Sequence, residues 1–206
     1  RPGDIAEALD RVHRPTGYRW RPPRRRHGGP PDATGPETTA LPWPTVVTAS
    51  LDLELAPLDG DARPLENWLT TFPLLPVVLD PYTHESAWVL DTARRILLTF
   101  QGADCRPCWI VTSPADDARR FLGPYADEML TFADPDARVA SGFGIEHAPA
   151  LALVRQDGAV IAAAQGWDPD AWREVTESVV ALTSWSRPVI PAAGDPAPFA
   201  GTRLGG

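Results

Sequence analysis

The sequence predicts an α/β fold in which a mixed sheet is flanked by helices, with a long irregular N-terminal arm and a C-terminal tail. Three observations carry this prediction. Between residues 45 and 185, short β-branched and apolar runs alternate with segments whose apolar residues recur at helical spacing. Two further runs flank a turn at residues 156–158, which predicts an antiparallel edge. The flanking segments, 1–44 and 186–206, are rich in Pro and Gly and lack periodicity.

The first half of the predicted domain begins with a strand over Val46–Leu55, a turn at residues 58–61 and a short helix over residues 64–72. The run Leu74–Leu79 is continuously apolar, which is typical of a strand covered on both faces. A long amphipathic helix should follow with Thr83 as its N-cap, because apolar residues then recur at helical spacing, namely Val89, Ala93, Ile96, Leu97 and Phe100.

The second half repeats this pattern and then changes it. A strand is predicted over Trp109–Thr112, and Ser113 and Pro114 have the residue types of an N-cap and first helical position. A third strand over residues 129–132 and a short helix over 137–143 precede the hairpin strands 150–155 and 159–164. Asp168 should start the last helix, whose apolar face consists of Trp172, Val175, Val179 and Leu182.

The N-terminal arm is the basic part of an acidic chain. Residues 1–26 contain eight arginines against three acidic residues, although the net charge of the whole chain is −8. The segment 4–12 predicts a short helix, and residues 15–44 should be extended. The arm combines large aromatic residues with arginines, the residue types that protein interfaces favour. We therefore expect it to bind a protein partner in a larger complex, through Tyr18, Trp20, Arg24, Arg25, Arg26 and Trp43.

Two classes of partner fit the composition poorly. The acidic remainder of the chain would repel a polyanion, which argues against nucleic acid as the partner of the basic arm. No apolar stretch approaches the roughly 20 residues that a membrane helix requires, and no signal-peptide pattern opens the chain. We expect a soluble, cytoplasmic protein, and the removal of an export signal before Arg1 stays open.

Several motifs carry a family resemblance. Phe132-Ala-Asp-Pro-Asp136 is followed by Phe143-Gly-Ile-Glu-His-Ala-Pro149, then by Asp157-Gly-Ala-Val-Ile and by Gly166-Trp. In this order they resemble the thioredoxin-like superfamily, in its TlpA and peroxiredoxin branch, over roughly Leu51 to Trp185. The resemblance implies a thioredoxin-like mixed sheet. It also implies that Pro149 is the family's cis-proline, facing the redox position.

The redox position itself holds no cysteine. In the family a Cys-x-x-Cys opens the long helix, where the helix dipole lowers the pKa of the first thiol. The resemblance places Thr83, His84, Glu85 and Ser86 at this motif. Neither hydroxyl forms a useful anion or a cross-link near neutral pH, so the inherited thiol chemistry is predicted to be absent.

The chain has one Cys-x-x-Cys elsewhere, at Cys105 and Cys108. It precedes a predicted strand instead of opening a helix, which places it at the far end of the sheet from Pro149. Three interpretations stay open: ordinary small residues in a turn, a structural disulfide, and a working dithiol.

The two histidines near the former redox position form a second candidate site. His84 and His147 should approach one another across the cleft, with Glu85 and Glu146 beside them. They could form a metal or acid/base pocket, or be surface histidines of a recognition loop. We favour recognition and predict no cofactor and no metal.

The leading hypothesis is a non-catalytic thioredoxin-fold protein that acts by binding, as an accessory or structural subunit or an assembly factor of a larger complex. Cysteine-free members of this fold serve as chaperones in hydrogenase assembly, which is an analogy of fold. The alternative is a thiol-disulfide oxidoreductase that uses Cys105 and Cys108. A metal-binding protein that uses His84 and His147 comes third.

Overall fold

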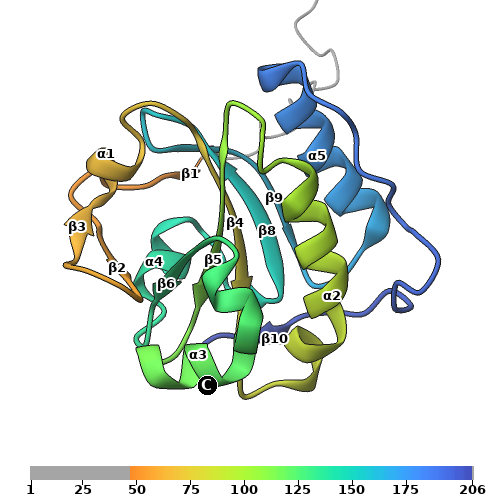
Figure 1. Cartoon of the computed structure of the whole chain (residues 1–206), viewed down its shortest axis with the longest axis horizontal. Helices are drawn as coiled ribbons and strands as arrows, with labels where there is room; N and C mark the ends of the chain where they lie inside the picture. The colour runs from red at the N-terminus through yellow and green to blue at the C-terminus, as the bar shows by residue number, and fades with distance from the viewer. Residues whose placement is uncertain (1–46, 206) are drawn as a thin grey trace, which may run out of the picture. The chain divides into compact units, whose positions relative to one another are not determined.

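The apolar run Leu74–Leu79 forms strand β4, the central strand of an eight-stranded sheet, and all six of its side chains are buried. The computed structural model describes residues 47–205 (Figure 1). The sheet order is β1-β9-β8-β4-β5-β6-β2-β3. This architecture confirms the predicted α/β class with a mixed sheet flanked by helices. The predicted helix at residues 4–12 and the arm up to residue 44 lie outside the described residues.

The centre of the sheet is parallel and one side is antiparallel. Strand β4 pairs in parallel with β5 (Arg106–Val111), which pairs in parallel with β6 (Leu130–Ala133). Helices α2 (His84–Thr99) and α3 (Ala115–Leu122) make the two crossover connections. On its other edge β4 pairs antiparallel with β8 (Ala150–Val154), and β8 forms the predicted hairpin with β9 (Ala159–Gln165).

The segment before β4 differs from the prediction. Instead of one strand over Val46–Leu55, β1 (Val47–Thr48) pairs with β9 and β2 (Glu54–Pro57) pairs with β6, so the two strands lie toward opposite edges of the sheet. A turn in which Leu53 N–H donates to Ser50 O allows the chain to cross between them. The predicted helix over 64–72 shortens to α1 (Leu65–Trp68), after a two-residue strand β3 (Arg63–Pro64).

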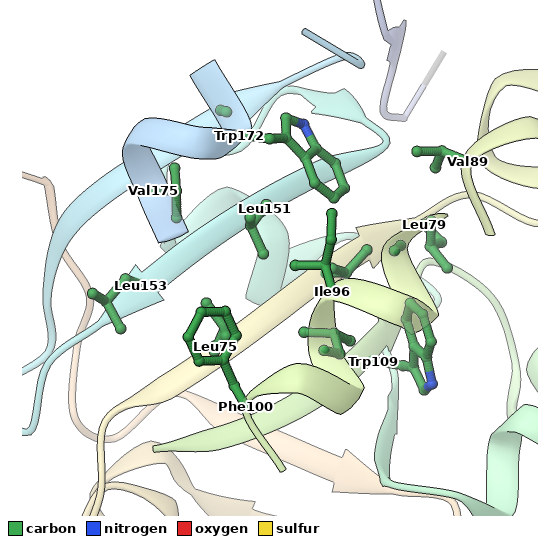
Figure 2. Close-up of a cluster of buried hydrophobic side chains, with 14 of the residues drawn as sticks. Leu75, Leu79, Val89, Ile96, Phe100, Trp109, Leu151, Leu153, Trp172 and Val175 are labelled. Carbon is green, nitrogen blue, oxygen red and sulfur yellow. The ribbon is translucent and has the colours of Figure 1, made fainter. Parts of the chain in front are cut away.

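Two apolar clusters cover the two faces of the sheet, because successive strand residues point to opposite sides. One cluster packs α2, α3 and α5 (Pro169–Thr183) against the sheet, and Figure 2 shows Ile96, Trp109, Leu151 and Trp172 meeting there. The other cluster joins α1 and α4 (Arg138–Gly142) to the opposite face. The predicted apolar face of α2 is buried. Of the face predicted for α5, Trp172, Val175 and Val179 are buried, whereas Leu182 is exposed.

Of the N-cap side chains predicted for α5 and α3, the structure confirms only the first. As predicted, Asp168 caps α5, because its carboxylate accepts from the N–H groups of Asp170 and Ala171 at 2.9 and 3.4 Å. The predicted cap at Ser113 is wrong: its hydroxyl donates to Pro114 O, and α3 begins at Ala115 with no side-chain cap. A 3₁₀ helix, η1 (Gly123–Asp127), continues directly from α3.

The C-terminal tail packs on its own domain. Residues 186–201 belong to no helix or named strand, and Ile190 is buried among the residues of the α2 and α5 cluster. Arg173 donates two hydrogen bonds to Ile190 O, and Arg95 donates to Val189 O. The tail residues Val189 and Ile190 therefore find hydrogen-bond partners within the domain.

The tail ends in a short strand that the sequence did not predict. Strand β10 (Thr202–Arg203) pairs antiparallel with β7 (His147–Ala148), directly before Pro149. In Figure 1 the tail descends past α5 and α2, and β10 crosses below the sheet near the start of α2. Among the described residues, no helix is both long and apolar enough to cross a membrane.

Candidate functional site

The candidate site lies at the carboxyl end of β4, where the chain turns into α2. Val78 pairs with Ala150, so Pro149 comes beside the last residue of β4, immediately before the loop that leads to Thr83. The Ala148–Pro149 peptide bond is cis. The register thus brings the loop of Pro149 to the residues that open α2.

The two hydroxyl groups at the start of α2 are held in one hydrogen-bond network. Ser86 is fully buried, and its Oγ accepts from the N–H of Asp80 at 2.9 Å. The Thr83 Oγ1 lies 3.0 Å from the carbonyl oxygen of Asp80 and 3.2 Å from the Ser86 Oγ. Thr83 is the N-cap residue by position, but its side chain caps no helix N–H group. Both hydroxyls therefore fix the loop between β4 and α2.

The two histidines have separate surroundings. His84 stacks on Trp88 of the same helix, with ring centroids 6.2 Å apart. His147 lies in β7, and its backbone pairs with Arg203 of the tail. Within residues 47–205 no hydrogen bond, ion pair or aromatic contact joins the two histidines. Glu85 stands in the first turn of α2, and Glu146 joins the tail through its backbone carbonyl.

The described part of the chain shows no cluster of side chains that could bind a metal ion. Residues 47–205 contain no group of three or more His, Cys, Asp or Glu side chains arranged to hold a metal ion. A metal pocket of His84 and His147 with Glu85 and Glu146, the less favoured alternative, is not among such groups in residues 47–205.

The tail shapes this site, which sequence reasoning missed. Phe199 contacts the exposed Trp88 edge to face at 5.7 Å, and its backbone exchanges two 2.9 Å hydrogen bonds with Trp167. Beside β10 a cavity of about 430 Å³ is lined by both site and tail residues, including Asp80, Tyr82, Thr112, Asp136, Thr202 and Arg203.

A glutamine supports the same loop. The Gln165 Oε1 accepts hydrogen bonds from the N–H groups of Glu146 and His147, both at 2.8 Å. The chain carries no local signal for this role, because Gln165 ends a strand 18 residues after His147.

Cys105 and Cys108 lie at the other end of the sheet and on opposite sides of it. Cys105 belongs to the cluster under α2 and α5, whereas Cys108 lies within β5 and points into the cluster on the α4 face. Arg106 pairs with Leu74, the first residue of β4, so the motif lies at the end of β4 remote from Pro149, as predicted. Both cysteines are free and buried.

Burial also makes the two thiols poor nucleophiles. Loss of solvation raises the pKa of Cys105 from its ordinary 9.0 to about 12, and the nearby Asp104 carboxylate acts in the same direction. Burial likewise raises the pKa of Cys108, against a smaller opposing effect of Arg106. Of the three interpretations of this motif, the free thiols contradict the disulfide, and the geometry favours ordinary packing residues.

Comparison with known proteins gives a fold. No family model and no curated protein matches the chain. Among solved structures, dsbF of Mycobacterium tuberculosis is 23% identical with a TM-score of 0.51, covering 65% of this chain and 96% of that one. The exposed lipoprotein thioredoxin Etrx1 of Streptococcus pneumoniae is 16% identical with a TM-score of 0.50, covering 62% and 98%.

A third match extends further along the chain. A hypothetical protein of Sinorhizobium meliloti is 13% identical with a TM-score of 0.57, covering 78% of this chain and 93% of that one. At such identities the likeness establishes the fold and leaves the activity open. The fold is thioredoxin-like.

Proposed function

We propose that this thioredoxin-fold chain is a non-catalytic binding protein, which serves as an accessory or structural subunit or as an assembly factor of a larger protein complex. The observation that carries the proposal is the network at the start of α2. There Thr83 and Ser86 stand at the two thiol positions, and their hydroxyls bond to the backbone of Asp80. Hydroxyls in this arrangement supply neither a disulfide nor a thiolate nucleophile.

The competing function is thiol-disulfide exchange by Cys105 and Cys108. The thioredoxin-like fold is compatible with this function, because dsbF and the thioredoxin Etrx1 have the same fold. The placement of the thiols argues against it. A dithiol that exchanges disulfides needs an exposed thiolate and a partner thiol within bonding distance. Here both thiols are buried, their pKa values are raised, and they point to opposite sides of the sheet.

The proposal assigns partner contacts to two parts of the chain. One is the basic arm, with its aromatic and arginine residues up to Trp43. The other is the loop surface around His84, Glu85, His147 and Pro149. A recognition role there fits the exposed His84 beside the Trp88 ring and the half-buried Glu85 and His147. We place the protein in the cytoplasm, where free cysteines such as Cys105 and Cys108 are usual.

Co-purification from the native host tests the proposal. A tagged full-length chain should retain a defined partner, and a variant that lacks residues 1–44 should lose it while keeping the circular dichroism spectrum of a folded domain. Retention by the truncated variant would move binding to the loop surface at His84 and His147. The absence of any stoichiometric partner for the full-length chain would contradict an accessory role.

A further inference from the structure

A cavity lined by both acidic and basic side chains lies at the carboxyl ends of the three parallel strands. Its volume is about 430 Å³, and its wall includes Asp80 after β4, Thr112 after β5 and Asp136 after β6. In open α/β sheets, ligands bind outside the carboxyl ends of the strands. The volume lies at the lower end of the range of about 300 to 1,000 Å³ that ligand pockets have, so the cavity suits a small molecule.

The tail supplies the basic residue of this cavity. Arg203 lines it together with Thr202 and Gly205, and Figure 1 shows the tail running from β10 toward α3. Backbone pairing with His147 fixes the main chain of Arg203, while its side chain is exposed. Among the described residues the Arg203 guanidinium makes no ion pair. A cation therefore faces the cavity and is free to bind an anionic group.

Two carboxylates face the same cavity with oxygen atoms that remain free. The Asp80 Oδ1 accepts from the N–H of Tyr82 at 2.9 Å, and the Asp80 carboxylate makes no other hydrogen bond or ion pair in the described part of the chain. Asp136 pairs with Arg138 at 3.5 Å, and both side chains are exposed. An exposed ion pair contributes little, so it leaves Asp136 available. Both carboxylates can therefore accept hydrogen bonds from a ligand.

A hydroxyl group and an aromatic ring complete the lining. The Thr112 Oγ1 donates to Leu79 O at 3.2 Å, which leaves lone pairs of this oxygen free to accept. The Tyr82 hydroxyl donates to Asp117 at 2.6 Å, so the ring is held in place although Tyr82 is 67% exposed. A fixed ring beside carboxylates favours a cationic group or the aliphatic stem that carries one.

We propose that this cavity binds a free basic amino acid such as lysine or arginine. Two carboxylates and one guanidinium match a ligand with two cationic groups and one carboxylate. The α-carboxylate of the ligand binds Arg203, and its two cationic groups bind Asp80 and Asp136. A neutral amino acid or a diamine would leave one of these protein charges unmatched. This site goes beyond the proposed binding of a protein partner, which does not depend on it.

An NMR titration of the full-length chain with L-lysine at low salt tests the site. We expect saturable shifts of the backbone amide signals of Thr112, Asp136 and Arg203, with a Kd below about 1 mM. Norleucine lacks the side-chain ammonium and cadaverine lacks the carboxylate. Each should bind at least tenfold more weakly than lysine, because each loses a charge-assisted hydrogen bond.

Matched variants separate the two ends of the ligand. Arg203→Gln should weaken lysine binding at least tenfold without weakening cadaverine, because the guanidinium contacts only the carboxylate. Asp80→Asn keeps an oxygen for the Tyr82 N–H and should weaken both lysine and cadaverine. The control is Arg187→Gln, which removes an exposed arginine that pairs with Glu177 on α5. It should bind both compounds as the wild-type chain does.

Three results would overturn the site. One is a Kd for lysine above about 10 mM, and another is equal binding of lysine, norleucine and cadaverine. The third is a set of shifts confined to residues outside the cavity. None of these results changes the co-purification test of the proposed function, because that test measures retention of a protein partner.

Discussion

Cys105 and Cys108 owe their character to the alternation of side chains along one strand. Cys108 faces one apolar cluster, and Cys105, just before the strand, faces the other. The sheet itself therefore separates the two thiols. In a Cys-x-x-Cys that opens a helix, both thiols would lie on the same side. Both cysteines therefore act as small apolar residues that fill space in the core.

Thiol reactivity should report this burial. A pKa raised from 9.0 to about 12 lowers the thiolate fraction of Cys105 near neutral pH about a thousandfold. We expect iodoacetamide to alkylate the native chain at least a hundredfold more slowly than the urea-unfolded chain, measured by mass spectrometry at pH 8. Native alkylation at a rate within a few-fold of the unfolded rate would show that the motif is accessible.

The same pKa shift gives stability a pH dependence. The folded state keeps the Cys105 proton up to about pH 12, whereas the unfolded thiol loses it near its ordinary pKa of 9.0. The contribution of this thiol to stability is complete below pH 9 and is lost as pH rises toward 12. Urea midpoints between pH 8 and pH 11 should fall less for Cys105→Ala than for the wild-type chain. Parallel curves for the two proteins would contradict the shift.

Helix α4 is one turn long and depends on a buried carboxylate. Asp134 accepts from the N–H groups of Val139 and Ala140 at 3.1 and 3.0 Å, and burial raises its pKa against these bonds. Removing the carboxylate leaves buried donors unpaired. Asp134→Ala should therefore destabilise the chain by about 1–3 kcal/mol.

The matched control is Asp136→Ala, two residues along and exposed, where its pair with Arg138 spans 3.5 Å. This change should cost no more than about 0.5 kcal/mol in a urea titration. Equal effects of the two substitutions would show that Asp134 does not hold the helix start.

The side chains at the start of α2 are close enough for a disulfide, although Thr83 and Ser86 are not cysteines. The hydroxyl oxygens of Thr83 and Ser86 lie 3.2 Å apart, so sulfur atoms there need only a small shift to reach a bond of about 2.05 Å. In a Cys105→Ala/Cys108→Ala background, Thr83→Cys/Ser86→Cys should form an intramolecular disulfide under glutathione oxidation. The wild-type chain should keep both thiols free under the same conditions, measured with Ellman's reagent after denaturation. Two free thiols in the engineered variant would contradict the position assigned to this turn.

Helices and strands with a clear hydrophobic pattern could be predicted from the sequence. Strands whose position depends on pairing with residues far away in the sequence could not. The apolar run of β4, the helical spacing in α2 and α5 and the β8–β9 hairpin all follow from local sequence. The split of Val46–Leu55 into β1 and β2 follows from two pairings on opposite sides of the sheet, which no local pattern records. Strand propensity depends on its neighbours in this way.

The residues of the candidate site show the same difference between local patterns and distant contacts. Thr83, Ser86 and Pro149 could be placed from the motifs around them, because Thr83 and Ser86 follow a recognisable strand and Pro149 directly precedes one. The approach of His84 and His147 that the sequence suggested produces no hydrogen bond or aromatic contact between them in the described residues, and the backbone of His147 pairs with Arg203. That pairing uses backbone groups of an aperiodic tail, and such groups carry no sequence signature apart from the close fit at Gly201.

At the scale of the whole molecule, the tail is part of the folded domain. The buried Ile190 and the Asp195 network attach it to α2 and α5, and β10 closes the edge beside Pro149. The chain therefore combines a thioredoxin-like domain with a covered redox face that contains hydroxyls in place of thiols. This combination supports the proposal that the chain acts by binding.

Turnover of a disulfide substrate tests that account most directly. In an insulin-reduction assay with dithiothreitol, the purified wild-type chain should accelerate precipitation no more than the buffer alone, and Cys105→Ser should behave identically. The reason is that neither the hydroxyls at α2 nor the buried thiols can attack a disulfide. Acceleration by the wild-type chain that disappears in Cys105→Ser would contradict the account and establish a thiol-disulfide oxidoreductase.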